Sequence, residues 1–214
     1  MSATRTGVVS LAVTVALAVP ACRRDTGVPA SPPATSESPA NAPATKRVVG
    51  PLSPEDAQAL ATMNDRLKAY IEEHQKLERS LPAVPKEATP LQIDQNQRAL
   101  EKLVRATRSA AKPGDLFTPE ARPVIKRLLA TVFGGPDGKQ LKSSIMDENP
   151  VGIKLAVNSR YPDSVPLSTI PPEVLQTLPK LPDELEYRFI GDRLVLFDVH
   201  AHVIADFIED ALPK

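Results

Sequence analysis

Two histidines near the end of the chain have the residue types and spacing of a metal site. His200 and His202 are separated by one residue, so in an extended segment both imidazole rings would lie on the same face, and Asp198 is close in sequence. Imidazole nitrogens and a carboxylate are typical ligands of divalent transition metals. A turn whose polar side chains are merely exposed is the alternative. His200, His202 and Asp198 are therefore candidate metal ligands.

A second pair of polar residues, His74 and Asn96, is expected to meet inside a helical hairpin. Each falls on the apolar face of its own predicted helix at 100° per residue. If the two helices pack antiparallel about their short loop, residues whose numbers sum to about 170 face each other, which places His74 beside Asn96. A buried polar group without a partner costs about 1–3 kcal/mol. We therefore expect a mutual hydrogen bond that fixes the helix register, with a ligand site as the alternative.

An apolar segment precedes the only cysteine of the chain. One positive charge, Arg5, is followed by a mostly apolar run over residues 8–19 and then by small residues up to Cys22. This is the layout of a secretory signal peptide, with cleavage between Ala21 and Cys22. The run is shorter than the ~20 apolar residues that span a bilayer. Residues 1–21 are therefore expected to be removed from the mature protein.

The last four residues of this segment, Val19-Pro20-Ala21-Cys22, resemble the lipobox of bacterial lipoproteins. The resemblance implies that the Cys22 thiol carries a diacylglycerol and that its amine is acylated, which anchors the chain in a membrane of the cell envelope, facing the periplasm. By the same resemblance, Arg23 after the cysteine favours the outer membrane. Ordinary secretion without a lipid is the alternative, because both processes cut the same bond.

The segment between this cysteine and the first predicted helix, residues 22–53, is rich in Pro, Ala, Ser and Thr. It contains too little apolar surface to offset the entropy lost on ordering, so it is expected to be a disordered tether. About 30 residues in a polyproline-like form would reach on the order of 90 Å. The tether would hold the following domain away from the membrane.

Residues 54–214 are predicted to form a single α+β domain, helical over 54–133 and strand-rich over 150–214. Helices are expected from Pro54 to about Leu81, from Pro90 to about Lys112 and from Thr118 to about Phe133, with the capping residues Ser53 and Thr89 before the first two. A helical hairpin plus a third helix would then cover one face of a small antiparallel sheet.

The strand-rich part is predicted from alternating and apolar runs. A half-buried strand is expected at residues 152–158, a short helix between 169 and 179, and strands at 185–190, 194–199 and 203–208. The run Leu194-Val195-Leu196-Phe197 is apolar on both faces, which predicts a central strand.

Residues 181–212 resemble a hairpin module at the ends of small periplasmic proteins, among them nickel/cobalt-homeostasis proteins. A Tyr-containing strand, the Gly191-Asp192 turn, a Leu-Val-Leu strand and a short valine-containing strand carry the resemblance. It implies the order of the strands and no activity. His200 and His202 in the second turn depart from the pattern.

Composition and the absence of known motifs argue against several classes of function. The chain has 26 basic and 26 acidic residues, so the basic excess of a nucleic-acid-binding protein is missing. The sequence contains no nucleophile elbow, phosphate-binding glycine loop or metalloprotease helix, and no cofactor is expected. The leading hypothesis is a non-enzymatic, lipid-anchored envelope protein that binds another envelope protein or is structural. The alternative is a metal- or small-ligand-binding module centred on His200 and His202.

Overall fold

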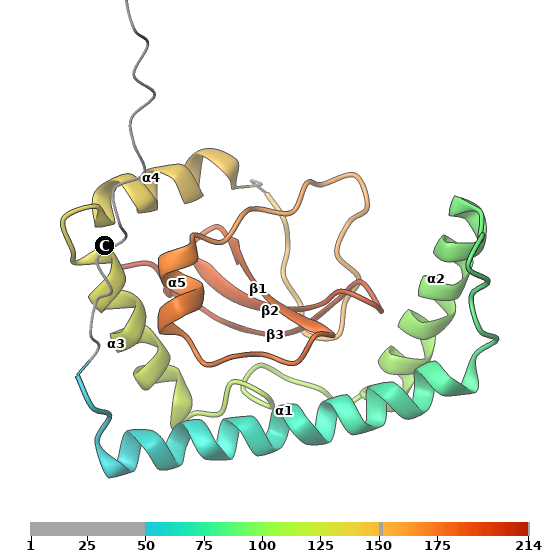
Figure 1. Ribbon diagram of the computed structural model, residues 1–214, viewed down its shortest axis with the longest axis horizontal. Coiled ribbons are helices and arrows are strands. Elements are labelled where there is room, and N and C mark those ends of the chain that lie inside the picture. The colour runs from blue at the N-terminus through green and yellow to red at the C-terminus, as the bar shows by residue number, and fades with distance from the viewer. Residues whose placement is uncertain (1–49, 150–151, 214) are drawn as a thin grey trace, which may run out of the picture. The chain divides into compact units, whose positions relative to one another are not determined.

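Five α-helices and one three-stranded antiparallel sheet make up the residues that the computed structural model describes, 50–149 and 152–213 (Figure 1). The elements are α1 (Pro54–Ser80), α2 (Pro90–Thr107), α3 (Ala121–Phe133), α4 (Gly138–Glu148), α5 (Pro172–Thr177), β1 (Leu185–Ile190), β2 (Arg193–Asp198) and β3 (Val203–Ile208). The fold is therefore of the α+β class, as predicted. The predicted signal peptide, Cys22 and nearly all of the tether lie outside the described residues. No helix in the described part is long and apolar enough to span a membrane.

The first two helices begin where their capping residues predict. The Ser53 hydroxyl accepts a hydrogen bond from the backbone N–H of Asp56, 3.1 Å away, and Pro54 occupies the first helical position. Thr89 and Gln92 form a capping box at the start of α2, in which each side chain accepts a hydrogen bond from the other's backbone N–H. These contacts satisfy N–H groups that have no partner within the helix.

The sheet has the order β1-β2-β3, with both pairs antiparallel and β2 in the centre. The tight turn between β1 and β2 contains Gly191, whose φ of 64° favours glycine. Five of the six residues of β2 are buried. The prediction of a central strand is confirmed, because β2 has a hydrogen-bonded neighbour on each side and apolar side chains on both faces.

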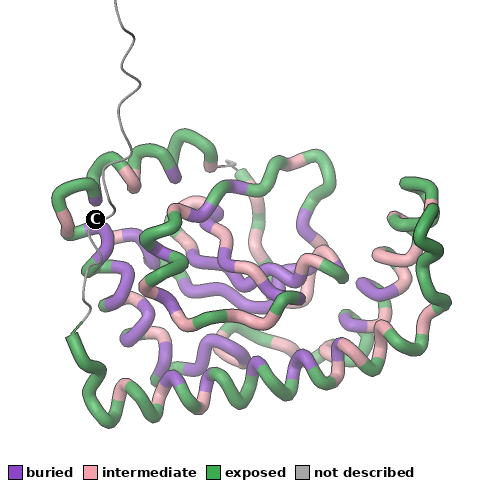
Figure 2. Tube along the Cα trace, in the orientation of Figure 1, coloured by how far each residue is buried: buried purple, intermediate pink, exposed green. Residues whose placement is uncertain are grey.

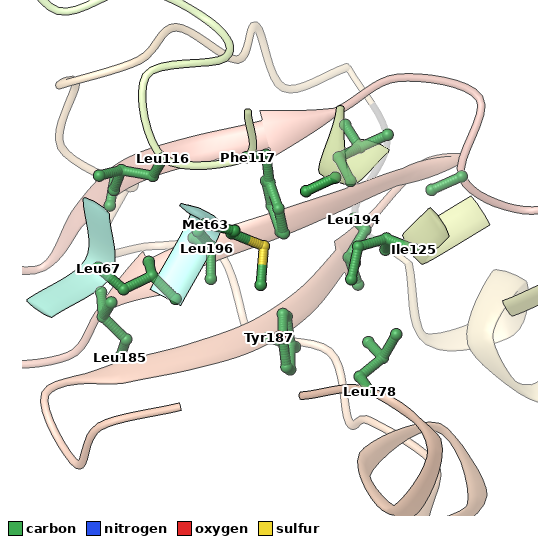
Figure 3. Close-up of a cluster of buried hydrophobic side chains, with 14 of the residues drawn as sticks. Met63, Leu67, Leu116, Phe117, Ile125, Leu178, Leu185, Tyr187, Leu194 and Leu196 are labelled. Carbon is green, nitrogen blue, oxygen red and sulfur yellow. The ribbon is translucent and has the colours of Figure 1, made fainter. Parts of the chain in front are cut away.

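One face of the sheet packs against the helices (Figure 3). Met63 and Leu67 of α1, with Ile125 of α3, pack against Leu194 and Leu196 of β2. Phe117 reaches the same core from the loop between α2 and α3, and its ring stacks on that of Tyr187 at 6.3 Å. Figure 2 shows the buried residues concentrated in the sheet and on the inward sides of α1 and α3. This is the helical cover that the sequence predicts.

The opposite face of the sheet has its own, smaller core. Tyr161, Val195 and Phe197 are among its buried members, and the partly buried Ile153, Leu155 and Val157 pack on them. The segment that covers this face, residues 152–158, is not the strand that the alternation predicts. Its side chains point inward as expected, but its backbone forms no ladder. The chain joins β3 at the end of this segment, where the Asn158 N–H donates to the Ile204 carbonyl at 2.7 Å, and at the bridge between Arg160 and Val203.

Asn158, at the end of this segment, has a left-handed backbone with a φ of 64°, which turns the chain there. Its side-chain amide donates hydrogen bonds to the carbonyls of Arg105 and Arg108, at 2.9 and 3.0 Å. These carbonyls belong to the end of α2, so Asn158 satisfies acceptors that the helix leaves free. Accordingly α2 ends at Thr107 and not near Lys112 as predicted.

Helices α1 and α2 follow each other as a hairpin, but they do not pack side by side in the predicted register. Figure 1 shows α2 inclined steeply to α1. Only Leu100, Glu101 and Val104 of α2 are buried, while Ile93, which the periodicity places on the apolar face, is 52% exposed. A further helix, α4, lies where the sequence predicts only a polar break. It buries just Gly138 and Ile145, so its apolar periodicity was too weak to recognise.

Candidate functional site

A buried carboxylate, Asp198, lies at the centre of a polar cluster where the end of β2 meets α1. Its side chain has no solvent exposure. Its Oδ2 atom accepts a hydrogen bond from the Tyr70 hydroxyl at 2.5 Å and lies 2.8 Å from Nδ1 of His74. Its Oδ1 atom accepts the backbone N–H of Ala201 at 2.7 Å, within the β2–β3 turn. The cluster thus joins the first helix of the fold to the last two strands.

Helix α1 supplies three side chains to the cluster at intervals of four residues. Tyr70, His74 and Glu78 therefore project from one face of the helix. His74 is 1% exposed, and its Nε2 atom is 3.8 Å from a carboxylate oxygen of Glu78. The other Glu78 oxygen is 3.1 Å from Nδ1 of His200, whose ring centre is 5.7 Å from that of His74. His200 thus lies directly beside the helix.

Burial and neighbouring charges shift the pKa values of this cluster, in opposite directions for His74 and Glu184 and in the same direction for Tyr70. Burial by itself would lower the pKa of His74, but the neighbouring Asp198 carboxylate raises the pKa above its usual value. Burial raises the pKa of the Tyr70 hydroxyl, and the Asp198 charge raises it further. Burial opposes the ionisation of nearby Glu184, but its hydrogen bond from Gln75 and the charges of His74 and His200 lower its pKa.

The predicted hydrogen bond between His74 and Asn96 does not form. His74 is buried as expected, but its partner is Asp198, while the Asn96 amide donates to the backbone carbonyl of Pro82 at 3.1 Å. The steep inclination of α2 removes Asn96 from the face of α1 that carries His74. One signal in the sequence could have indicated the true partner: Asp198 is a single acid at the end of a strand that is apolar on both faces.

The predicted metal site of His200, His202 and Asp198 is also not assembled. His202 adopts a left-handed backbone, with a φ of 57°, so the segment is a turn and the two imidazoles have different surroundings. The His202 ring packs edge-on against Phe197 at 5.1 Å, and its Nε2 is 3.6 Å from Asp163. Burial, followed by the charge of Arg160, lowers the pKa of His202.

His200 and Asp198 do converge, but on His74. Among the described residues, the group whose ligand atoms could hold a metal ion is His74, Glu78 and His200, with all three atoms within 4.8 Å of one another. No local pattern in the sequence joins Glu78 to the histidines, because the pairing depends on where the β2–β3 turn meets α1.

A groove runs along the side of α1 and ends beside this cluster. Its volume is about 1190 Å³. Helix α1 forms one wall, and the end of α2 and the loop at residues 114–120 form the other. Tyr70 and His74 belong both to the groove lining and to the polar cluster. The two features are therefore adjacent parts of one region.

The loop that forms one wall of the groove is fixed by a second buried carboxylate, Asp206 of β3. Its side chain has no solvent exposure. One of its oxygens, Oδ2, accepts the backbone N–H groups of Leu116 and Phe117, both at 2.8 Å, and the other accepts that of Gly114 at 3.1 Å. Asp206 is therefore the residue that positions this wall.

Charged residues divide the groove along its length. At the end near the start of α1, Glu55 and Glu120 are exposed and form no ion pair within the described part of the chain. Farther along, the Arg108 guanidinium lies over the Tyr70 ring, 4.9 Å from its centre, and donates a hydrogen bond to the carbonyl of Ala205. The acidic end is therefore free to receive a positive charge, whereas Arg108 already has partners.

Comparison with known proteins gives no relative from which a role could be transferred. No family model, no curated protein and no solved structure matches the chain.

Proposed function

We propose that the chain is a lipid-anchored, non-enzymatic protein of the cell envelope, facing the periplasm, whose α+β domain binds a segment of another envelope protein in the groove along α1. The groove is the observation that carries this proposal. It is bounded by three separate parts of the chain and has its wall held in place by the buried Asp206. Such pre-organisation reduces the entropic cost of binding.

The size of the groove favours a peptide segment over a small molecule. Pockets for small molecules typically have volumes of about 300–1,000 Å³, and this groove exceeds that range at about 1190 Å³. The partly exposed apolar side chains Ala59 and Leu77 offer surface to a ligand, and exposed residues such as Ala69 leave the groove open to solvent. An extended or helical segment with apolar residues fits this shape.

The charges indicate the chemistry of that segment. The unpaired acids Glu55 and Glu120 lie at one end, so a basic residue of the partner would find complementary charge there. Rim charges of this kind affect the association rate and specificity more than the affinity. The proposed ligand is therefore a peptide with an apolar stretch followed or preceded by Lys or Arg.

The anchoring part of the proposal is supported by the sequence around Cys22. Acylation explains the single cysteine, and more than one acyl chain gives stable attachment where one alone does not. A Cys22→Ser variant tests it. The native chain is expected in the membrane fraction and should be labelled by radioactive palmitate, whereas the variant should be absent from the membrane fraction and unlabelled. A variant that remains in the membrane fraction would refute the lipid anchor.

The groove is tested by placing a photoreactive amino acid at Ala69 and, as a matched control, at Ala61. Both are exposed alanines of α1, but only Ala69 lines the groove. Irradiation of cells is expected to give an adduct of defined mass from Ala69, none from Ala61, and a weaker one from Ala69 when Glu55 and Glu120 are changed to Lys. Equal adducts from both positions, or none from either, would contradict binding in the groove.

A metal ion held jointly by His200 and His202 is not supported, because their side chains lie in different surroundings.

A further inference from the structure

One nitrogen in the polar cluster has no partner that explains its position. Both ring nitrogens of His74 are buried and form no hydrogen bond with the described part of the chain, but Nδ1 has the Asp198 carboxylate at 2.8 Å, whereas Nε2 has no charged group so close. The nearest charged atom is a Glu78 oxygen at 3.8 Å, beyond hydrogen-bond distance. A buried polar atom left without a partner costs about 1–3 kcal/mol. Its position is explained if it binds something that the protein chain does not itself provide.

The surroundings of the other ring nitrogen, Nδ1, indicate the tautomer of the neutral imidazole. Nδ1 lies 2.8 Å from Asp198 Oδ2, a close charge contact that is not aligned as a linear hydrogen bond. A carboxylate can only accept, so in the neutral ring, the form that binds a metal ion, we assign the proton to Nδ1. The lone pair is then on Nε2. A histidine held by a carboxylate through one nitrogen, with the other nitrogen free, is the usual arrangement of metal-binding histidines.

We propose that His74 Nε2, a Glu78 carboxylate oxygen and His200 form a binding site for a divalent transition-metal ion, with Asp198 as the positioning residue of His74. The inference does not depend on whether the groove holds a peptide.

The distances are compatible with a site that closes around the ion. Bonds of about 2.0–2.2 Å in a tetrahedral zinc site place ligand atoms about 3.4 Å apart. Here the three ligand atoms lie within 4.8 Å of one another, so an inward movement of about 1 Å is needed. Glu78 and His200 can supply it, because their side chains are 42% and 43% exposed. His74, packed and fixed by Asp198, stays in place.

The ligand types select the class of metal. Two imidazole nitrogens and one carboxylate suit zinc and similar borderline ions, whereas Ca²⁺ and Mg²⁺ require sites built mainly from oxygen. Three protein ligands leave a fourth position for water or another ligand. The exposed sides of Glu78 and His200 place that position toward solvent.

The test begins with the full chain, stripped of metal with a chelator and dialysed. Titration with Zn²⁺ at pH 7.5 is followed by calorimetry, and titration with Co²⁺ by visible absorption, which reports coordination geometry. We expect one Zn²⁺ per chain, unaffected by millimolar Mg²⁺ or Ca²⁺, and a Co²⁺ spectrum of four-coordinate type. Failure of the native chain to bind Zn²⁺ would overturn the proposal and leave the cluster as a buried ion-pair network.

Variants then identify the ligands. His200→Ala and Glu78→Gln alter half-exposed side chains and should each abolish stoichiometric binding, with unchanged circular dichroism in the absence of metal. Asp198→Asn should weaken binding by about 10–100-fold, as loss of such a partner typically does. His202→Ala is the matched control and should bind like the native chain. Loss of binding in His202→Ala, or retention in His200→Ala, would overturn this ligand set.

Discussion

Replacing Asp206 by Asn should destabilise the fold and loosen the wall of the groove. Its Oδ2 accepts from Leu116 and Phe117, and its Oδ1 from Gly114 and from the backbone N–H of Phe207 at 2.7 Å. With its oxygen in the Oδ2 position, Asn keeps the first two bonds and the longer contact of Gly114 with that oxygen, at 3.2 Å, but presents its own N–H₂ to the Phe207 N–H. An N–H left without an acceptor costs about 1–3 kcal/mol, so we expect a loss of about that size, to which the weaker bond of Gly114 adds.

Urea unfolding of the full chain, followed by far-ultraviolet circular dichroism, measures this loss. Asp147→Asn, an exposed position on α4, is the control and should change the free energy of unfolding by less than about 0.5 kcal/mol. Amide hydrogen exchange adds a local measurement, because protection of Gly114 should fall more than that of Leu116. A loss below about 1 kcal/mol for Asp206→Asn would refute the argument that this carboxylate holds the loop.

Two further predictions concern other parts of the fold. Gly138→Ala should lower the free energy of unfolding by about 1–3 kcal/mol, because a Cβ there would lie 1.8 Å from the Phe133 carbonyl oxygen. Gly50→Ala is the control and should leave the free energy of unfolding unchanged, because nothing lies within 4 Å of a Cβ at that position. Thermal or urea unfolding measures both. The hydrogen bond from Arg160 lowers the pKa of Asp163 below its usual value of 3.8. The ionised Asp163 therefore stabilises the fold above pH 3.8, and this stabilisation is lost as the pH falls through the lowered pKa. Melting temperatures of native and Asp163→Asn chains should therefore converge at low pH, and a constant difference would contradict this.

Much of the fold follows from local signals in the sequence. Caps at Ser53 and Thr89 fixed the starts of two helices, and the apolar run Leu194–Phe197 placed β2 in the centre of the sheet. These signals act over a few residues, so they can be interpreted without knowledge of the tertiary structure. The inward-facing side chains of residues 153–157 were predicted correctly as well, because alternation determines which side chains are buried even where no ladder forms.

The candidate site could not be predicted because it depends on contacts between distant residues. The angle between α1 and α2 decides that His74 meets Asp198 and not Asn96, and no local pattern encodes that angle. The left-handed conformation of His202 similarly separates two histidines that would share a face in an extended strand. The role of Asp206 cannot be predicted from local sequence for the same reason, since its partners lie about 90 residues earlier in the chain.

The Tyr70–Asp198 hydrogen bond, which joins residues 128 positions apart, has a consequence for how the chain folds. Contacts of high sequence separation form slowly, because a large loop must be closed before any stabilisation is gained. Helix α1 emerges first during synthesis, yet the sheet against which it packs begins only at Leu185. A fragment that ends before Leu185 would therefore leave the apolar faces of α1 and α3 in water. The helical and strand-rich parts are a single folding unit, and proteolysis or truncation between them should yield aggregating or rapidly degraded pieces.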